Sequence, residues 1–106
     1  RDLRDGSTGL PRQAAAVDLG DTIVGPDLEA THARHQATVR QVIADGKRLI
    51  SLGGGNDLAY PDLAGLAEAT PVGLALNVDA HYDVRADTPR NSGTPYRQLL
   101  DEGRLA

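Results

Sequence analysis

The chain has 106 residues, a formal net charge of −4 and 40% hydrophobic residues, enough for one small domain with a packed core. It contains no cysteine, which excludes disulfides and thiolate metal ligands within this sequence. The cytoplasm is then the default expectation for its compartment. The acidic balance does not favour nucleic acid, and no apolar run approaches the roughly 20 residues of a membrane span. We therefore expect neither nucleic acid nor a membrane as a partner.

The order of predicted elements is typical of an α/β protein. Short apolar runs predict strands over residues 14–19, 48–52 and 72–78. Apolar spacings of three and four predict helices over residues 28–44, 61–69 and about 96–102. Because strands and helices alternate, we expect right-handed βαβ units and a parallel sheet with flanking helices.

The first predicted helix has clear end signals and carries two histidines. Asp27 is a suitable N-cap, and Gly46 is a stop signal. His32 and His35 lie three residues apart on one face, so a metal pair is one interpretation. No carboxylate of matching register is evident nearby, so packing or surface histidines are the favoured interpretation.

Three side chains of metal-ligand type follow the third predicted strand at a spacing of two: Asp79, His81 and Asp83. In extended backbone such residues point to the same side, which predicts that they converge. Two carboxylates and one imidazole suit manganese, and less specifically iron, nickel or zinc. The alternative is that these are surface residues and that Asp79 caps a turn.

Several segments together resemble the arginase, or ureohydrolase, family. Residues 73–85 (GLALNVDAHYDVR) resemble its second metal motif, and residues 52–57 (LGGGND) its first, a glycine run before a metal-binding histidine. Residues 17–21 (VDLGD) fit its early strand. Residues 92–100 (SGTPYRQLL), together with Arg85, resemble the formimidoylglutamase branch. The resemblance implies a three-layer αβα fold, of which residues 1–106 form a partial domain without the C-terminal half.

The same resemblance implies a chemistry for the three ligand-type side chains. Asp79 would bridge two manganese ions, His81 would bind one ion and Asp83 the other. Water acidified by the metals would attack the planar carbon of a linear amidine, and a C–N bond of that carbon would be hydrolysed. The implied reaction converts N-formimidoyl-L-glutamate and water into L-glutamate and formamide. The full-length protein is expected to be a homo-oligomer acting on a small amidine or guanidino substrate.

Two departures from the family pattern bear on activity. Asn56 stands where the first motif has its histidine, and an amide oxygen is a weaker ligand than imidazole. Asn56 is therefore a doubtful ligand: the resemblance implies two manganese ions in the full-length family, and the substitution allows a site with only one here. The later Asp-x-Asp motif of the family is absent, and the chain has no methionine. We therefore expect a fragment of a longer protein, inactive alone.

Four residues near the metal motif are candidate substrate contacts. Arg85 and Arg97 could each pair with a carboxylate of N-formimidoyl-glutamate, because a guanidinium binds a carboxylate bidentately. Asn91 and Ser92 could hydrogen-bond the amino-acid end of the substrate. The alternatives are structural ion pairs for the arginines and a turn at Asn91-Ser92-Gly93.

Other functions remain open from the sequence. Asn56 is compatible with a non-catalytic arginase-like domain acting in assembly or regulation. An agmatinase or guanidino-acid hydrolase differs only in substrate, and the glycine run at 53–55 allows a small-molecule or nucleotide-binding module. Tyr96 lies near the position of a proton-shuttle histidine in some arginases. It cannot do that work near neutral pH, which argues against arginase proper.

Overall fold

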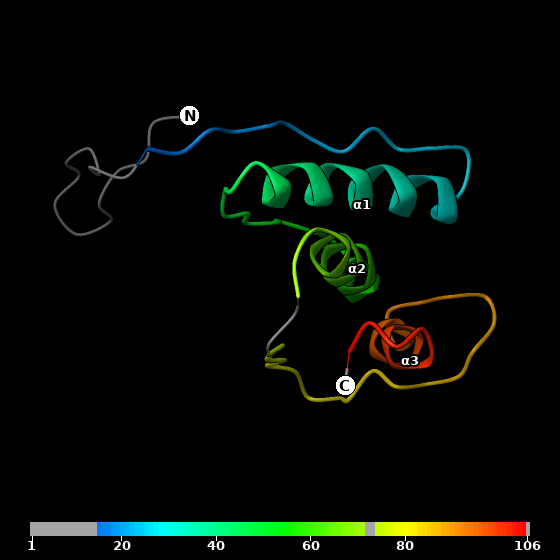
Figure 1. The fold of residues 1–106 in the computed structure, drawn as a ribbon. Coiled ribbons are helices and arrows are strands. Elements are labelled where there is room, and N and C mark those ends of the chain that lie inside the picture. The colour runs from blue at the N-terminus through cyan, green and yellow to red at the C-terminus, as the bar shows by residue number, and fades with distance from the viewer. Residues whose placement is uncertain (1–14, 72–73, 106) are drawn as a thin grey trace, which may run out of the picture.

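The computed structural model describes residues 15–71 and 74–105 of the chain, and its helices stack in chain order (Figure 1). The elements are α1 (Leu28–Ala44), the short 3₁₀ turn η1 (Asn56–Leu58), α2 (Ala59–Ala69) and α3 (Pro95–Asp101). Helix α1 packs on α2, and α2 packs on α3. The three predicted helices are confirmed, although α2 and α3 begin slightly earlier than the sequence pattern suggested.

Both predicted end signals of α1 are confirmed. The Asp27 carboxylate accepts a hydrogen bond from the Ala30 backbone N–H at 2.7 Å, which satisfies a free donor of the first turn. At the other end Gly46 has a φ of 72°, a left-handed conformation that glycine adopts without strain. Its N–H donates to the carbonyl of Ile43 at 2.9 Å, so the helix ends there.

Helix α2 is the centre of the packed part of the molecule. Ala64 and Leu99 are fully buried, and together with Tyr60 they form the core between α2 and α3. On the side facing α1, a Cβ atom at Gly65 would lie 2.6 Å from the carbonyl oxygen of Gln36. Only glycine therefore allows α2 to approach the backbone of α1 this closely.

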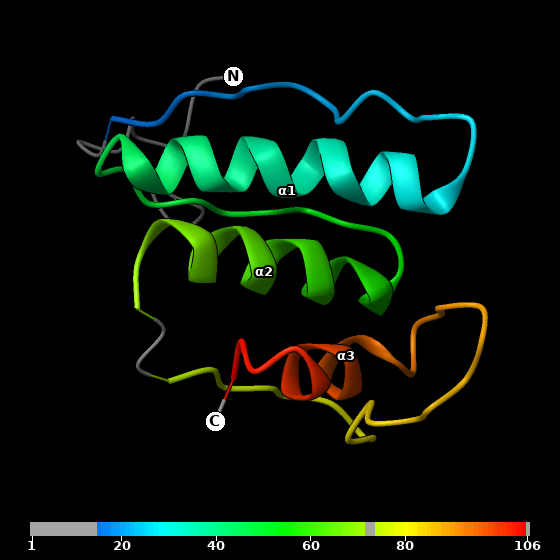
Figure 2. The same cartoon turned by 45° about the vertical axis from the view of Figure 1, so that its right-hand side comes forward.

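The predicted parallel sheet is not present among the described residues, which contain no β-strand. Residues 15–19, 48–52 and 74–78 instead run as connecting segments in one common direction, opposite to α1 and α2 (Figure 2). Residue 14 and residues 72–73 of the predicted strands lie outside the described residues.

The physical reason lies in the missing partners of these segments. A strand needs backbone hydrogen bonds to a neighbouring strand, and no backbone bond joins these segments within the described ranges. All of their large apolar side chains except that of Leu49 are 61% to 91% exposed, namely those of Val17, Leu19, Ile50, Leu52, Leu74, Leu76 and Val78. The order and direction of the segments thus suit a parallel sheet, but its pairing stays a prediction.

A polar cluster fastens two of the connecting segments to the helices. His35 on α1 lies 2.9 Å from the Thr22 hydroxyl through Nδ1 and 2.8 Å from the Asp62 carboxylate through Nε2. The Ser51 hydroxyl donates to the same Asp62 oxygen at 2.7 Å. These bonds hold the segments before and after α1 in fixed positions against α1 and α2.

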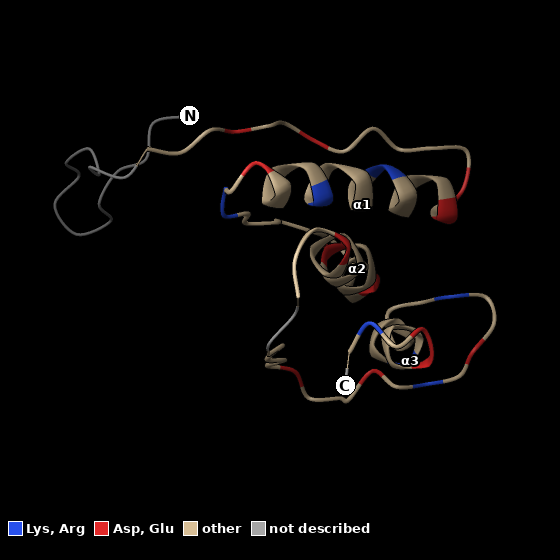
Figure 3. Ribbon diagram, in the orientation of Figure 1, with Lys and Arg blue, Asp and Glu red and all other residues tan. Residues whose placement is uncertain are grey.

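The charges of the chain are distributed unevenly over its elements. Acidic and basic residues both occur on α1 and in the loop before α3, whereas the charged residues of α2 are all acidic (Figure 3). Every helix in residues 15–71 and 74–105 is too short or too polar to cross a lipid bilayer.

Candidate metal and substrate site

Residues around Asn56 and residues of the loop before α3 meet at Asp83. The Asn56 side-chain amide donates to the Asp83 carboxylate at 2.6 Å and to the Ser92 backbone carbonyl at 3.3 Å. The backbone N–H of Tyr96 donates to the Asp83 carbonyl at 3.2 Å. The two segments that resemble metal motifs and the loop before α3 therefore lie side by side.

Asp83 itself is buried and has an unusual backbone conformation. Only 9% of the residue is exposed, and its φ is 52°. Asp is one of the few residues with a side chain that visit the left-handed region readily. This conformation turns the backbone out of the extended pleat, so the Asp83 carboxylate points to Asn56.

Asp79 and His81 form a separate pair. The Asp79 carboxylate accepts a hydrogen bond from the His81 backbone N–H at 2.8 Å, and it lies 3.5 Å from the Nδ1 atom of the imidazole. The His81 side chain is 83% exposed. Asp79 therefore stabilises a tight turn, as the alternative interpretation of this residue predicted.

The predicted convergence of Asp79, His81 and Asp83 does not occur among the described residues. No three acidic or histidine side chains there are grouped closely enough to hold a metal ion together. The prediction assumed extended backbone, but the turn at Asp79 and the left-handed Asp83 break the alternation. The side chains form two pairs instead, Asp79 with His81 and Asp83 with Asn56.

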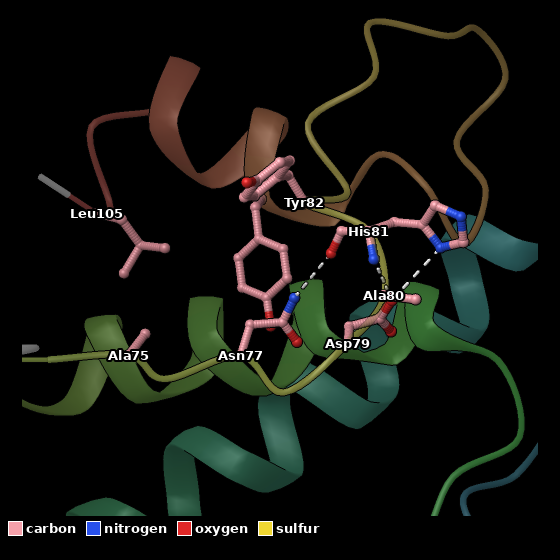
Figure 4. Close-up of a pocket in the computed structure, with 8 residues that line it drawn as sticks. Ala75, Asn77, Asp79, Ala80, His81, Tyr82 and Leu105 are labelled. Carbon is pink, nitrogen blue, oxygen red and sulfur yellow. Dashed lines mark hydrogen bonds and ion pairs between the residues drawn. The ribbon is translucent and has the colours of Figure 1, made fainter.

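A pocket of about 340 Å³ opens beside the first of these pairs. Asp79 and His81 lie at one end of it, and Ala75 and Leu105 at the other (Figure 4). Its volume is in the range of small-molecule sites. The sequence analysis singled out Asp79, His81 and Tyr96 of its lining but not the other residues, Ala75, Asn77, Ala80, Tyr82 and Leu105.

Tyr96 brings a phenol to this pocket. Burial raises the pKa of Tyr96, and the charges of Asp83 and Asp79 raise it further. The phenol is therefore neutral at neutral pH and acts as a hydrogen-bonding group. This agrees with the prediction that Tyr96 cannot serve as a proton shuttle there.

Arg85 and Asn91 are organised around Asp87, a residue that the sequence analysis did not consider. The Arg85 Nε donates to the Asp87 carboxylate at 2.8 Å, and the Asn91 amide donates to the same oxygen at 3.1 Å. These bonds, that from Asn91 foremost, hold the pKa of Asp87 below its usual range. The Asn91 side-chain oxygen also accepts from the Gly93 N–H at 2.9 Å, which gives the predicted turn.

Arg97 and Ser92 lie at the surface. The Arg97 Nε donates to both oxygens of Asp101, one turn further along α3, at 3.0 and 2.9 Å. Ser92 is exposed, and its backbone carbonyl accepts the bond from Asn56 described above. Exposed ion pairs contribute about 1 kcal/mol or less, so Arg97 can exchange its partner easily.

Both histidines of α1 have carboxylate partners, contrary to the sequence analysis. His35 pairs with Asp62 as described, and His32 lies 2.7 Å from the Asp57 carboxylate. These partners are 25 and 27 residues away in the sequence, so only the packing of η1 and α2 against α1 reveals them. The metal pair remains without support, since each imidazole is occupied by its own carboxylate.

Solved structures of similar fold place the chain in the class of arginase-like α/β folds. A structure described as Trypanosoma cruzi formiminoglutamase with Mn²⁺ matches at 37% identity and a TM-score of 0.71, covering 78% of this chain and 29% of that chain. Formimidoylglutamase from Bacillus subtilis matches at 28% identity and a TM-score of 0.80, covering 94% and 33%.

Sequence comparison leads to the same class. The Arginase family profile matches residues 2–106, and the chain belongs to the Arginase family. Formimidoylglutamase from Paraburkholderia xenovorans is 38% identical over 115 residues, covering 92% of this chain and 36% of the relative. Formimidoylglutamase from Klebsiella pneumoniae subsp. pneumoniae is 44% identical over 93 residues, covering 81% and 28%. The chain thus spans about a third of the length of these relatives.

Proposed function

We propose that the full-length protein hydrolyses the C–N bond of N-formimidoyl-L-glutamate to give L-glutamate and formamide. The proposal is supported by relatives and structural neighbours named formimidoylglutamase or formiminoglutamase. The observation that carries it within this chain is the 2.6 Å bond between Asn56 and Asp83, which joins the first metal motif to the second.

We propose that Asp79, His81 and Asp83 hold manganese in the full-length protein, with Asn56 as a weak additional ligand. The chemistry of the donor set fits, because carboxylate oxygen and imidazole nitrogen are ligands that this metal accepts. Binding would require residues 79–83 to rearrange, because the three side chains now form two separate pairs. When bound, manganese supplies Lewis-acid activation of water and of the amidine. Asn56 contributes a neutral amide in place of an imidazole, which favours one bound ion over two.

The pocket beside Asp79 and His81 is the proposed place of the amidine. The neutral Tyr96 phenol offers a hydrogen-bond donor or acceptor in its wall. Arg85 follows the lining residue Tyr82 by three positions, and Arg97 is the direct neighbour of Tyr96. These two arginines are proposed to orient the two substrate carboxylates. Asn91 and Ser92 are proposed to shape and bind the amino-acid end between them.

Product analysis of the full-length protein tests the proposal. Glutamate and formamide are measured after incubation with N-formimidoyl-L-glutamate and Mn²⁺, and in parallel with agmatine, arginine and a guanidino acid. We expect turnover of the formimidoyl substrate alone, loss with EDTA, and loss in Asp79→Asn. The matched control Asp21→Asn changes an exposed carboxylate outside the pocket and should retain activity. Turnover that survives both EDTA and Asp79→Asn would contradict the proposal.

Asn56 favours a second candidate, a non-catalytic arginase-like domain. In that case the metal site has lost an imidazole without replacement, and neither the wild type nor Asn56→His hydrolyses any amidine. Turnover that appears only in Asn56→His identifies a degraded site. Turnover in the wild type excludes the non-catalytic candidate.

A further inference from the structure

His32 on α1 is bonded to the turn that carries the first metal motif. The residue is 3% exposed, and its Nε2 atom lies 2.7 Å from the Asp57 carboxylate. Because a carboxylate only accepts hydrogen bonds, the proton between them belongs to Nε2. The pair therefore links α1 to η1 by a directional bond.

The position of Asp57 makes this link relevant to Asn56, its direct neighbour. A Cβ atom at Gly55 would lie 2.1 Å from an Asp57 carboxylate oxygen, so glycine leaves the space into which that carboxylate folds back. The Leu58 N–H donates to the Gly55 carbonyl at 3.2 Å and closes the turn. With Asp57 held from one side, Asn56 faces Asp83 on the other.

Packing alone does not account for His32. Its Nδ1 atom is buried and has no hydrogen-bond partner among the described residues. Leaving a buried polar atom unpaired costs free energy, and an apolar side chain of similar size would avoid that cost. The histidine is better explained by what its other nitrogen does, which is to hold Asp57.

We propose that His32 and Asp57 are positioning residues of the metal site, which keep Asn56 against Asp83. This inference rests on the proposed function and extends it to residues that touch neither metal nor substrate. Residues that orient metal ligands typically change metal affinity by about 10- to 100-fold when mutated.

The full-length protein and three variants test the inference with Mn²⁺ alone as the probe. His32→Ala removes the bond to Asp57, and His32→Gln keeps a side-chain N–H in its place. His35→Ala is the matched control. His35 lies on the same helix as His32, and its substitution breaks an equivalent histidine–carboxylate bond, to Asp62 of α2 and away from Asn56. Calorimetric titration gives the dissociation constant, and hydrogen exchange follows the backbone amides of residues 56–58 without metal.

We expect His32→Ala to weaken Mn²⁺ binding about 10- to 100-fold and to accelerate exchange at residues 56–58. His32→Gln should recover part of both effects, and His35→Ala should change the affinity less than about threefold. Equal effects of His32→Ala and His35→Ala on affinity and exchange would overturn the inference while the proposed function stands. A wild type that binds no Mn²⁺ would overturn both.

Discussion

The hydrogen bond between Asn56 and Asp83 should contribute measurably to stability before any metal binds. Asp83 is only 9% exposed, and its carboxylate accepts a hydrogen bond from the Asn56 side-chain amide at 2.6 Å. Such a bond contributes about 1.5–3 kcal/mol, compared with about 1 kcal/mol between neutral groups. Asn56→Ala should therefore lower the free energy of unfolding by about 1.5–3 kcal/mol.

A double-mutant cycle isolates this bond from other effects of the substitutions. Asp83→Asn removes the charge and suits the left-handed backbone at this position, since Asn tolerates a φ of 52° as Asp does. In the background of Asp83→Asn, Asn56→Ala should cost about 1 kcal/mol less than in the wild type. The free energies come from urea unfolding of the full-length protein in EDTA, which removes the contribution of bound metal.

Asn77→Ala is the matched control for this cycle. Asn77 lies in the same part of the molecule, and its amide donates to the His81 carbonyl only at 3.5 Å. Its substitution should change the free energy of unfolding by less than about 0.5 kcal/mol. If Asn56→Ala costs no more than the control, or costs the same with and without the Asp83 charge, the segments around Asn56 and Asp83 are not held together as described.

Three further predictions address packing, metal binding and charge. Gly65→Ala should lower the free energy of unfolding, measured by urea titration, by about 1–3 kcal/mol, because the new Cβ atom would lie 2.6 Å from the Gln36 carbonyl oxygen. An unchanged free energy of unfolding would refute the close approach of α2 to α1. Asn56→His should tighten Mn²⁺ binding at least about tenfold in a calorimetric titration, or about 1.4 kcal/mol, and unchanged affinity would exclude this position as a ligand. By NMR, the Asp87 carboxyl should titrate with a pKa below 3.8, moving upward in Asn91→Ala. Because folding lowers this pKa, the contribution of Asp87 to stability is present above 3.8 and is lost as the pH falls through the lower value; an Asp87 pKa unaffected by Asn91→Ala would contradict this.

The helices were predictable because their signals are local. The Asp27 cap and the Gly46 stop of α1 act within four residues of the helix ends, and the structure confirms both. The start of α2 was placed two residues late, because Ala59 and Tyr60 carry no capping signal of their own. Pairing of the strand-like segments depends on neighbours distant in sequence, and the described residues provide no such pairing.

The site was predictable in its location and not in its geometry. The resemblance of three segments to one family singled out Asn56, Asp83 and Ser92, and the structure places these three residues in contact. The alternation rule then failed, because it holds only for extended backbone and the sequence does not reveal the left-handed Asp83. The bond from His32 to Asp57 was not predicted for another reason. Its two residues are 25 positions apart, and only the tertiary packing brings them together.

The central claim is that the segment 79–83 binds manganese, and the most direct measurement is crystallographic. Crystals of the full-length protein grown with Mn²⁺ are measured at the manganese absorption edge, where anomalous scattering locates the ion. Our account predicts a peak in direct contact with the Asp79 and Asp83 carboxylates and the His81 imidazole. A peak bound elsewhere, with Asp79 still paired to His81 and Asp83 still paired to Asn56, would contradict it.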